Sequence, residues 1–413
     1  MINTKNQQLA FDKFNKLKVG ALFMKMGTGK TKVAMSLVNY NKVDLLIYIC
    51  PFSTKDNIQD EINKWGINCD YRIIGYETIQ SSDGQYLKLF AEMENKKCFI
   101  IADESIFIKN EETKRFNRLL QLRNKCQYAL ILNGTPITKN EWDIYNQIYF
   151  LSPKIINMNR PQFLQTFFKK ITYKKLHQSE HTFYKFSEIN AEYLKKLIAP
   201  YIFECDLDFD KKEEDNFIYI DCDRTDYIYE KEHKLKEYQK YGNSQTIINM
   251  LTQLNVISAN SVNKNDALID YIKDKQIIVY CNFLSEIEYI SERIDCFKIV
   301  GKTKRRKEII KDFEKNNKPL LMTFGVGSYS LNLQFCNEIV YSSLNFDYAK
   351  IEQSKYRIKR LGQEQNIKYT YFLTTFGINK LILENLKKKQ TLENLIKEKL
   401  QNKGELELWI KNL

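Results

Sequence analysis

The sequence lacks long hydrophobic runs: none of its 413 residues falls in a stretch of the roughly 18 apolar residues that a membrane-spanning helix needs. Its opening, MINTKNQQLAFDKF, contains no apolar signal core. The nine cysteines are scattered, with no two within ten residues of each other, which argues against a disulfide framework and against a zinc ribbon. We found no internal repeat and no low-complexity tract. We therefore expect a cytoplasmic protein from a reducing compartment, with no membrane partner.

The composition instead supports packed cores and a polyanionic partner. Hydrophobic residues make up 43% and aromatic residues 13%, which is enough apolar surface for a folded chain. The length exceeds that of one compact domain, so two or three domains are expected. The net charge of +13 suits nucleic acid. The abundance of Lys, Asn, Ile and Tyr is typical of an AT-rich bacterial or viral genome, and this bias accounts for part of the charge.

Short apolar runs alternate with polar, helix-like stretches in two parts of the chain. Runs of this length, bounded by helical segments, are typical of buried parallel strands in an α/β sheet. The predicted strands are 21–24, 45–51, 98–102, 129–132, 276–281, 297–300, 319–324, 338–343 and 368–373, and 304–313 is a predicted helix.

The alternation of short apolar runs with helix-like stretches is absent between these two parts of the chain. Residues 151–262 are polar and predicted to be helical, with an acidic, solvated connection at 205–216. The fold prediction is therefore an α/β protein with two parallel-sheet lobes and a helical insertion between them. The predicted domains are lobe 1 (1–150), insertion and linker (151–262), lobe 2 (263–385) and a helical C-terminal tail (386–413).

A glycine-rich turn follows the first predicted strand and precedes a helix. Free backbone N–H groups and the helix dipole at such a turn favour phosphate. Lys30 is expected to reach the β- and γ-phosphates of ATP, and Thr31 to hold Mg²⁺. The full pattern has glycine where this chain has Met24. The predicted nucleotide-binding residues in this turn are Gly27, Thr28, Gly29, Lys30 and Thr31.

Charged side chains at other predicted strand ends complete a phosphoryl-transfer set. Asp103 is expected to bind Mg²⁺ through water, and Glu104 to accept a proton from the attacking water. In the second lobe, Arg357 and Arg360 are three residues apart, which on a helix places both on one face. Two arginines that reach a phosphate across a cleft would act as arginine fingers.

In this order, these motifs resemble those of superfamily two helicases and translocases, and within that superfamily the Swi/Snf-like branch. Residues 331–334 (LNLQ) and 353–363 (QSKYRIKRLGQ) are similar to motifs five and six, and 134–136 (GTP) to motif three. The resemblance implies two RecA-like lobes and DNA-stimulated hydrolysis of ATP. It also implies adenine recognition by Gln7. The residues that it implies for coupling between the lobes are Gly134, Thr135, Asn332, Gln334 and Gln353.

Three positions depart from the branch's pattern. Ile106 stands in the place of a usual histidine, Lys25 in that of an acidic residue and Ser330 in that of a glycine. None of the three removes a residue that hydrolysis needs.

Basic and aromatic residues are interleaved from 154 to 186. This pattern suits a surface that follows phosphates and stacks on bases. It equally suits a small helical insertion whose aromatic residues form its core and whose lysines are solvated. The predicted nucleic-acid residues are Lys169, Lys170, Lys174 and Lys175. The pattern HQSEH at 177–181 has zinc-ligand spacing on a helix, but without an obvious third ligand we expect it to be a solvated surface.

The sequence therefore predicts an ATP- and Mg²⁺-dependent translocase on DNA, with duplex or branched DNA favoured and RNA not excluded. We expect no small-molecule substrate other than ATP. One alternative is a strand-separating helicase on single-stranded DNA or RNA. Another is a catalytically silent nucleic-acid-binding module, which the presence of Lys30, Glu104 and both arginines disfavours.

Overall fold

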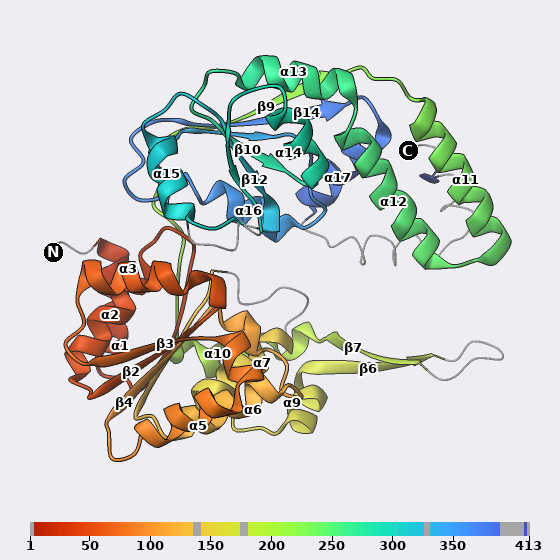
Figure 1. Ribbon diagram of the computed structural model, residues 1–413. Helices are drawn as coiled ribbons and strands as arrows, with labels where there is room; N and C mark the ends of the chain where they lie inside the picture. The colour runs from red at the N-terminus through yellow and green to blue at the C-terminus, as the bar shows by residue number, and fades with distance from the viewer. Residues whose placement is uncertain are drawn as a thin grey trace. The chain divides into compact units, whose positions relative to one another are not determined.

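The computed structural model describes residues 4–134, 142–173, 181–301, 303–325, 331–388 and 409–410. The chain divides into two compact units, Met1–Asp208 and Phe209–Leu413, and each has its own parallel sheet and cores (Figure 1). None of the helices in the described ranges is long and apolar enough to cross a membrane.

The first unit is built on a six-stranded sheet in which all paired neighbours are parallel. Alternate side chains point to opposite faces: Leu45, Ile47 and Ile49 enter one core, whereas Leu46, Tyr48 and Cys50 enter the other. Both faces are therefore buried, which explains the nearly continuous apolar runs. The strand order is β3 (Asp70–Gly75), β2 (Leu45–Cys50), β4 (Cys98–Asp103), β5 (Tyr128–Leu132), β1 (Val19–Met24) and β8 (Ile202–Cys205).

Helices cover both faces of this sheet. One face is covered by α1 (Lys5–Phe14), α2 (Lys30–Asn41) and α3 (Lys55–Trp65). The other is covered by α4 (Tyr76–Ser81), α5 (Asp83–Glu92), α6 (Lys114–Asn124), α7 (Trp142–Leu151), α8 (Pro153–Ile156), α9 (Arg160–Phe167) and α10 (Ala191–Ile198). The short 3₁₀ helices are η1 (Phe52–Thr54), η2 (Ser105–Ile108), η3 (Glu188–Asn190) and η4 (Ala199–Tyr201).

An antiparallel hairpin, β6 (Phe168–Tyr173) and β7 (His181–Phe186), projects from the first unit as an arm (Figure 1). Its base is anchored by aromatic packing. The Phe168 ring lies 5.5 Å from that of Phe186 and 6.0 Å from those of Trp142 and Phe163.

The second unit repeats the architecture with another six-stranded sheet whose paired neighbours are parallel. The strand order is β11 (Phe297–Ile299), β12 (Leu320–Thr323), β10 (Ile278–Cys281), β13 (Glu338–Tyr341), β14 (Ile367–Thr374) and β9 (Glu213–Ile220). One face packs on α13 (Val262–Ile272) and α14 (Leu284–Ser291). The other packs on α11 (Thr225–Tyr241), α12 (Ser244–Ala259), α15 (Arg306–Glu314), α16 (Tyr348–Lys355) and α17 (Gly377–Lys387).

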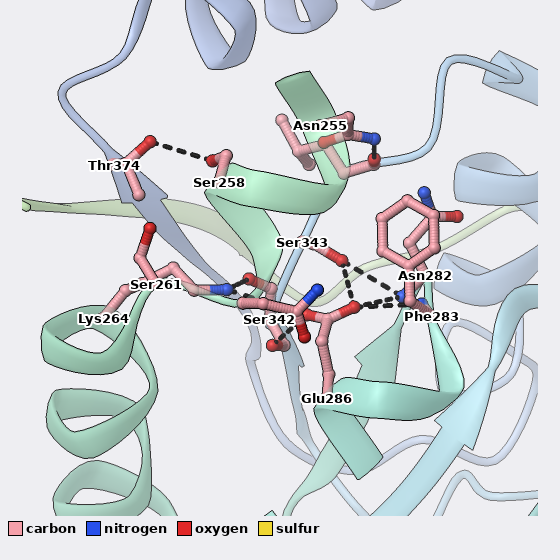
Figure 2. A network of polar contacts seen from close by, with 12 residues as sticks. Asn255, Ser258, Ser261, Lys264, Asn282, Phe283, Glu286, Ser342, Ser343 and Thr374 are labelled. Atoms are coloured by element: carbon pink, nitrogen blue, oxygen red, sulfur yellow. Dashed lines mark hydrogen bonds and ion pairs between the residues drawn. The ribbon is translucent and has the colours of Figure 1, made fainter. Parts of the chain in front are cut away.

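A buried polar network ties two helices to two strand ends of this sheet (Figure 2). The Glu286 carboxylate accepts hydrogen bonds from the Ser342 and Ser343 hydroxyls at 2.5 and 2.7 Å and from the backbone N–H groups of Asn282 and Phe283, both at 3.0 Å. The Lys264 ammonium lies 3.6 Å from the same carboxylate. The network therefore fixes the loops that follow β10 and β13.

The α/β prediction with two parallel-sheet lobes is confirmed, and all nine predicted strands are present with small shifts at their ends. The description of 151–262 as helical and without a sheet was wrong. That stretch contains β6 to β9, and β8 and β9 complete the two sheets. Because the units divide between residues 208 and 209, the expected insertion is shared between them. Both β8 and β9 are edge strands with only one neighbour, so they carry polar residues such as Glu204 and Asn216 among the apolar ones.

The predicted connection at 205–216 and the C-terminal tail agree with the structure only in part. The unit boundary lies within the acidic stretch, but β9 already begins at Glu213. Most of the predicted tail lies outside the described residues. Ile410 is described, and it is buried in the core of the second unit.

Candidate active site

The phosphate loop connects β1 to α2 and is shaped by two glycines. Gly27 and Gly29 have φ angles of 80° and 86°, in the left-handed region that favours glycine. The Lys30 ammonium donates to the carbonyl oxygens of Met24 at 2.8 Å and Lys25 at 3.4 Å. It therefore lies within the loop, beside the first turn of α2, where the helix dipole favours an anion.

Gln7 lies against this loop. Its amide Nε2 donates to the Thr28 carbonyl at 3.0 Å, and its Oε1 accepts from the Thr4 backbone N–H at 3.3 Å. A Cβ atom at Gly29 would lie 2.4 Å from Gln7 Nε2, so a side chain at this position would displace the Gln7 amide. Gln7, the residue predicted to recognise adenine, thus supports the phosphate loop through this hydrogen bond.

The two predicted acidic residues lie at the carboxyl end of β4. The Asp103 carboxylate accepts from Tyr48 Oη at 2.9 Å through Oδ2 and from the Glu104 backbone N–H at 3.0 Å through Oδ1. Burial raises the pKa of Asp103, and the nearby Lys30 ammonium and the Tyr48 hydrogen bond oppose that shift. Glu104 has a left-handed backbone with φ 53°, which is uncommon outside glycine and occurs at sites with a functional constraint.

Two buried tyrosines that sequence reasoning missed hold Asp103. Tyr48 in β2 contacts its side chain, and Tyr76 in α4 donates to its backbone carbonyl at 2.8 Å. Burial raises the pKa of both tyrosines well above the usual value, so both hydroxyls keep their protons. In sequence, a tyrosine within an apolar strand indicates only a core residue.

The oxygen atoms gathered here suit a magnesium ion. Asp103 offers a carboxylate at the end of β4 and Thr31 a hydroxyl in the first turn of α2, and hydroxyl and carboxylate oxygens are ligands that Mg²⁺ prefers. Lys30 is close enough to influence the Asp103 carboxylate electrostatically. The predicted phosphate and metal residues therefore lie at one end of the first sheet.

The segment after β5 contacts both the phosphate loop and the acidic segment. A Cβ atom at Gly134 would lie 3.6 Å from the Met26 side chain. The preceding Asn133 donates to the Ser105 hydroxyl at 3.5 Å, and Ser105 donates to Gln147 at 2.5 Å. Thr135, also predicted for coupling, lies outside the described residues.

In the second unit, Arg357 and Arg360 lie together, but not on a helix as predicted. Helix α16 ends at Lys355, and both arginines occupy the turn that follows it. The helix does not continue because the Arg357 carbonyl accepts from the Leu333 N–H at 3.2 Å. The Ile358 carbonyl accepts from the Gln363 side chain at 3.4 Å.

These arginines are held differently. Arg357 is 3% exposed, whereas Arg360 is partly exposed and donates to the Tyr356 carbonyl at 2.7 Å and to Asn332 Oδ1. Burial raises the pKa of Tyr280 to about 12, and both guanidinium groups oppose that shift, so both lie near its hydroxyl. Residues from motifs five and six are thus in direct contact.

Of the other predicted coupling residues, Gln334 is partly buried and its Oε1 atom has no hydrogen-bond partner among the described residues. Gln353 lies in α16 and is also partly buried.

The predicted nucleic-acid lysines lie on the hairpin arm. Lys169 and Lys170 are exposed in β6, where Lys169 is directly opposite Lys185 and Lys170 is opposite Tyr184. Lys174 and Lys175 lie outside the described residues. Of the HQSEH pattern only His181 is described, and it lies in a strand rather than in a helix.

Comparison with known proteins matches both units to domains of nucleic-acid motors. Residues 68–264 match the SNF2-related domain, and residues 263–362 match the helicase conserved C-terminal domain. The chain belongs to the Swi/Snf-like branch of superfamily two. This membership confirms the family predicted from the motifs, including the ATP-dependent helicase and translocase core that the branch shares.

Several Swi/Snf-like relatives are similar over most of this chain. It is 23% identical over 78% of its length to the ATP-dependent helicase YqhH of Bacillus subtilis, and 21% identical over 93% to the human DNA annealing helicase and endonuclease ZRANB3. It is 20% identical over 88% to SWI/SNF-related matrix-associated actin-dependent regulator of chromatin subfamily A-like protein 1 of Drosophila melanogaster. The chain spans 63%, 40% and 52% of these three relatives, respectively.

Proposed function

We propose that this chain is an ATP-driven translocase that moves on DNA, with duplex or branched DNA as its favoured substrate. The observation that carries the proposal is the meeting of Lys30, Thr31 and Asp103 at one end of the first sheet, with Glu104 next along the chain. This set supports phosphoryl transfer from a nucleoside triphosphate. The similarity to ZRANB3, a DNA annealing helicase and endonuclease, supports DNA as the polymer.

Each residue of the set has a role in this proposal. Lys30 binds the β- and γ-phosphates, and Thr31 and Asp103 hold Mg²⁺. When bound, the ion neutralises charge that develops on the phosphates. Glu104 orients the attacking water and accepts its proton. Its place directly after the end of β4, next to Asp103, supports this role.

Arg357 and Arg360 act from the second unit as arginine fingers when the two units close on ATP. Asn332 Oδ1 accepts a hydrogen bond from the Arg360 guanidinium. A movement of the motif five segment, residues 331–334, would therefore displace that guanidinium directly. This contact supports a route by which DNA bound near motif five promotes hydrolysis.

The hairpin arm supplies a contact to the phosphate backbone. Like charges directly opposite each other on a hairpin are destabilising, yet Lys169 and Lys185 face each other across the two strands. Within the described ranges neither lysine has an acidic partner within ion-pair distance. A phosphate between the two ammonium groups would relieve their repulsion. On the opposite face, Tyr184 is 46% exposed beside Lys170 and offers a ring for stacking.

The arm also favours one second function, strand separation. Beyond its anchored base, the two-stranded hairpin projects from the lobe and has the form of a wedge (Figure 1). A strand-separating helicase on single-stranded DNA or RNA is therefore the alternative to translocation on an intact duplex.

The experiment that tests the proposal is hydrolysis of ATP measured with duplex DNA, forked DNA, single-stranded DNA and RNA. We expect the strongest stimulation with duplex or forked DNA. Stimulation by single strands or RNA alone would favour the strand-separating alternative, and absence of stimulation by all four would refute the motor.

A further inference from the structure

Tyr48 occupies an unusual place for a core residue. It lies in the middle of β2, is fully buried, and packs in the core beneath α1 and α2. Its ring needs no hydroxyl to fill that space. The hydroxyl nevertheless reaches the end of the neighbouring strand β4, where it lies 2.9 Å from Asp103 Oδ2.

The chemistry of the two groups determines the direction of this hydrogen bond. An ionised carboxylate only accepts, so Tyr48 donates its single proton to Asp103.

The Asp103 carboxylate is held in an equally definite orientation. Oδ2 accepts from Tyr48 and Oδ1 accepts from the Glu104 N–H at 3.0 Å. Each oxygen has one protein donor and keeps further lone-pair capacity for metal-bound water. The metal-binding carboxylate is thus oriented by a buried hydroxyl and a backbone N–H group.

We propose that Tyr48 is a positioning residue of the magnesium site, whose hydroxyl orients the Asp103 carboxylate so that it can bind the ion together with the nucleotide. The proposal rests on the proposed function, because it takes Mg²⁺ with ATP or ADP as the ligand of this site. Residues around a metal site that orient its ligands typically contribute 10- to roughly 100-fold to metal affinity.

The chain contains a matched control. Tyr76 is also a fully buried tyrosine of the same unit, and its hydroxyl also donates to Asp103, at 2.8 Å, but to the backbone carbonyl rather than to the carboxylate. Tyr76→Phe therefore removes one buried hydroxyl and one hydrogen bond to the same residue, without touching either metal-binding side chain.

The test uses Mn²⁺ as the probe, with binding to the protein and ADP followed by electron paramagnetic resonance. We expect Tyr48→Phe to weaken Mn²⁺ binding about 10- to 100-fold. Binding of ADP in the presence of EDTA should be unchanged, and Tyr76→Phe should retain the parent's Mn²⁺ affinity. Thermal unfolding of both variants shows whether each is folded before the metal is added.

Two outcomes would overturn the proposal. Mn²⁺ affinity of Tyr48→Phe equal to that of the parent would show that the hydroxyl does not position the ligands. An equal loss in Tyr76→Phe would show a general effect of a missing buried hydrogen bond. Failure of the parent itself to bind Mn²⁺ with ADP would instead contradict the proposed function, so the two failures are distinguishable.

Discussion

Loss of the Lys264 charge should strongly destabilise the second unit while leaving the first unchanged. The Lys264 side chain is 1% exposed, and its ammonium donates to the Ser342 carbonyl at 2.7 Å and lies 3.6 Å from Glu286. Burial lowers the pKa of Lys264, and the Glu286 carboxylate acts in the opposite direction. The pair is therefore a buried charge pair in which each member compensates the other (Figure 2).

The magnitude follows from what each substitution leaves behind. Removing one member of a buried ion pair costs about 3–5 kcal/mol. Lys264→Met should fall near about 3 kcal/mol, because Glu286 keeps four other hydrogen bonds. Glu286→Gln should cost at least as much, since it leaves an ammonium group in the core. The double variant leaves no unpaired charge, so it should be less destabilised than the sum of the single variants by about 2 kcal/mol.

Native-state hydrogen exchange can measure these effects in one unit at a time. Amides of β10 and β13 report on the second unit, and those of β2 and β4 in the same sample serve as the internal control. A loss of about 3 kcal/mol corresponds to exchange that is faster by roughly a hundredfold. Unchanged exchange of β10 and β13 in Lys264→Met would refute the reasoning, as would full additivity of the two substitutions.

Three further predictions concern the motor. Glu104→Gln should bind ATP as the parent does but lose turnover, measured as nucleotide affinity and steady-state hydrolysis; near-parental turnover would show that Glu104 does not activate water. Arg360→Ala should slow DNA-stimulated hydrolysis by about 10³- to 10⁵-fold with nucleotide and DNA affinity retained. Arg293→Ala on the same unit is its control, and full stimulated turnover in Arg360→Ala would contradict its role. Replacing Lys169 and Lys185 by Gln should flatten the salt dependence of log DNA affinity by up to about 1.8 units, measured by fluorescence anisotropy. The same change at Lys88 and Lys96 should not flatten the salt dependence. Equal slopes in the two double variants would show that the hairpin lysines are solvated and do not contact DNA.

The parts of the fold and site that the sequence predicted depend on local patterns. Central parallel strands are buried on both faces, so their apolar runs are visible without knowledge of neighbours. The candidate residues Lys30, Asp103 and Glu104 follow the ends of such strands, which is why the sequence could predict their positions at one end of the sheet. The two arginines also lie together as expected, although the expected helix is a turn stabilised by contacts with residues from elsewhere in the chain.

The parts that were missed depend on which elements become neighbours. Edge strand β9 begins with Glu213, and its acidic side chains looked like a solvated connection. In the folded unit Glu213 pairs with Lys359 at 2.5 Å and Asp215 accepts from the Tyr371 hydroxyl at 3.0 Å. Similarly, only the pairing of β2 with β4 brings the Tyr48 hydroxyl to Asp103. Neither relationship leaves a periodic signal in the sequence.

Movement along DNA is the central claim, and displacement of a third strand from a duplex measures it most directly. A labelled triplex-forming strand is bound to a duplex, and its release is followed after addition of the protein and ATP. The account predicts ATP-dependent release that is abolished by Glu104→Gln and Arg360→Ala. ATP hydrolysis stimulated by the duplex without any release of the third strand would contradict translocation.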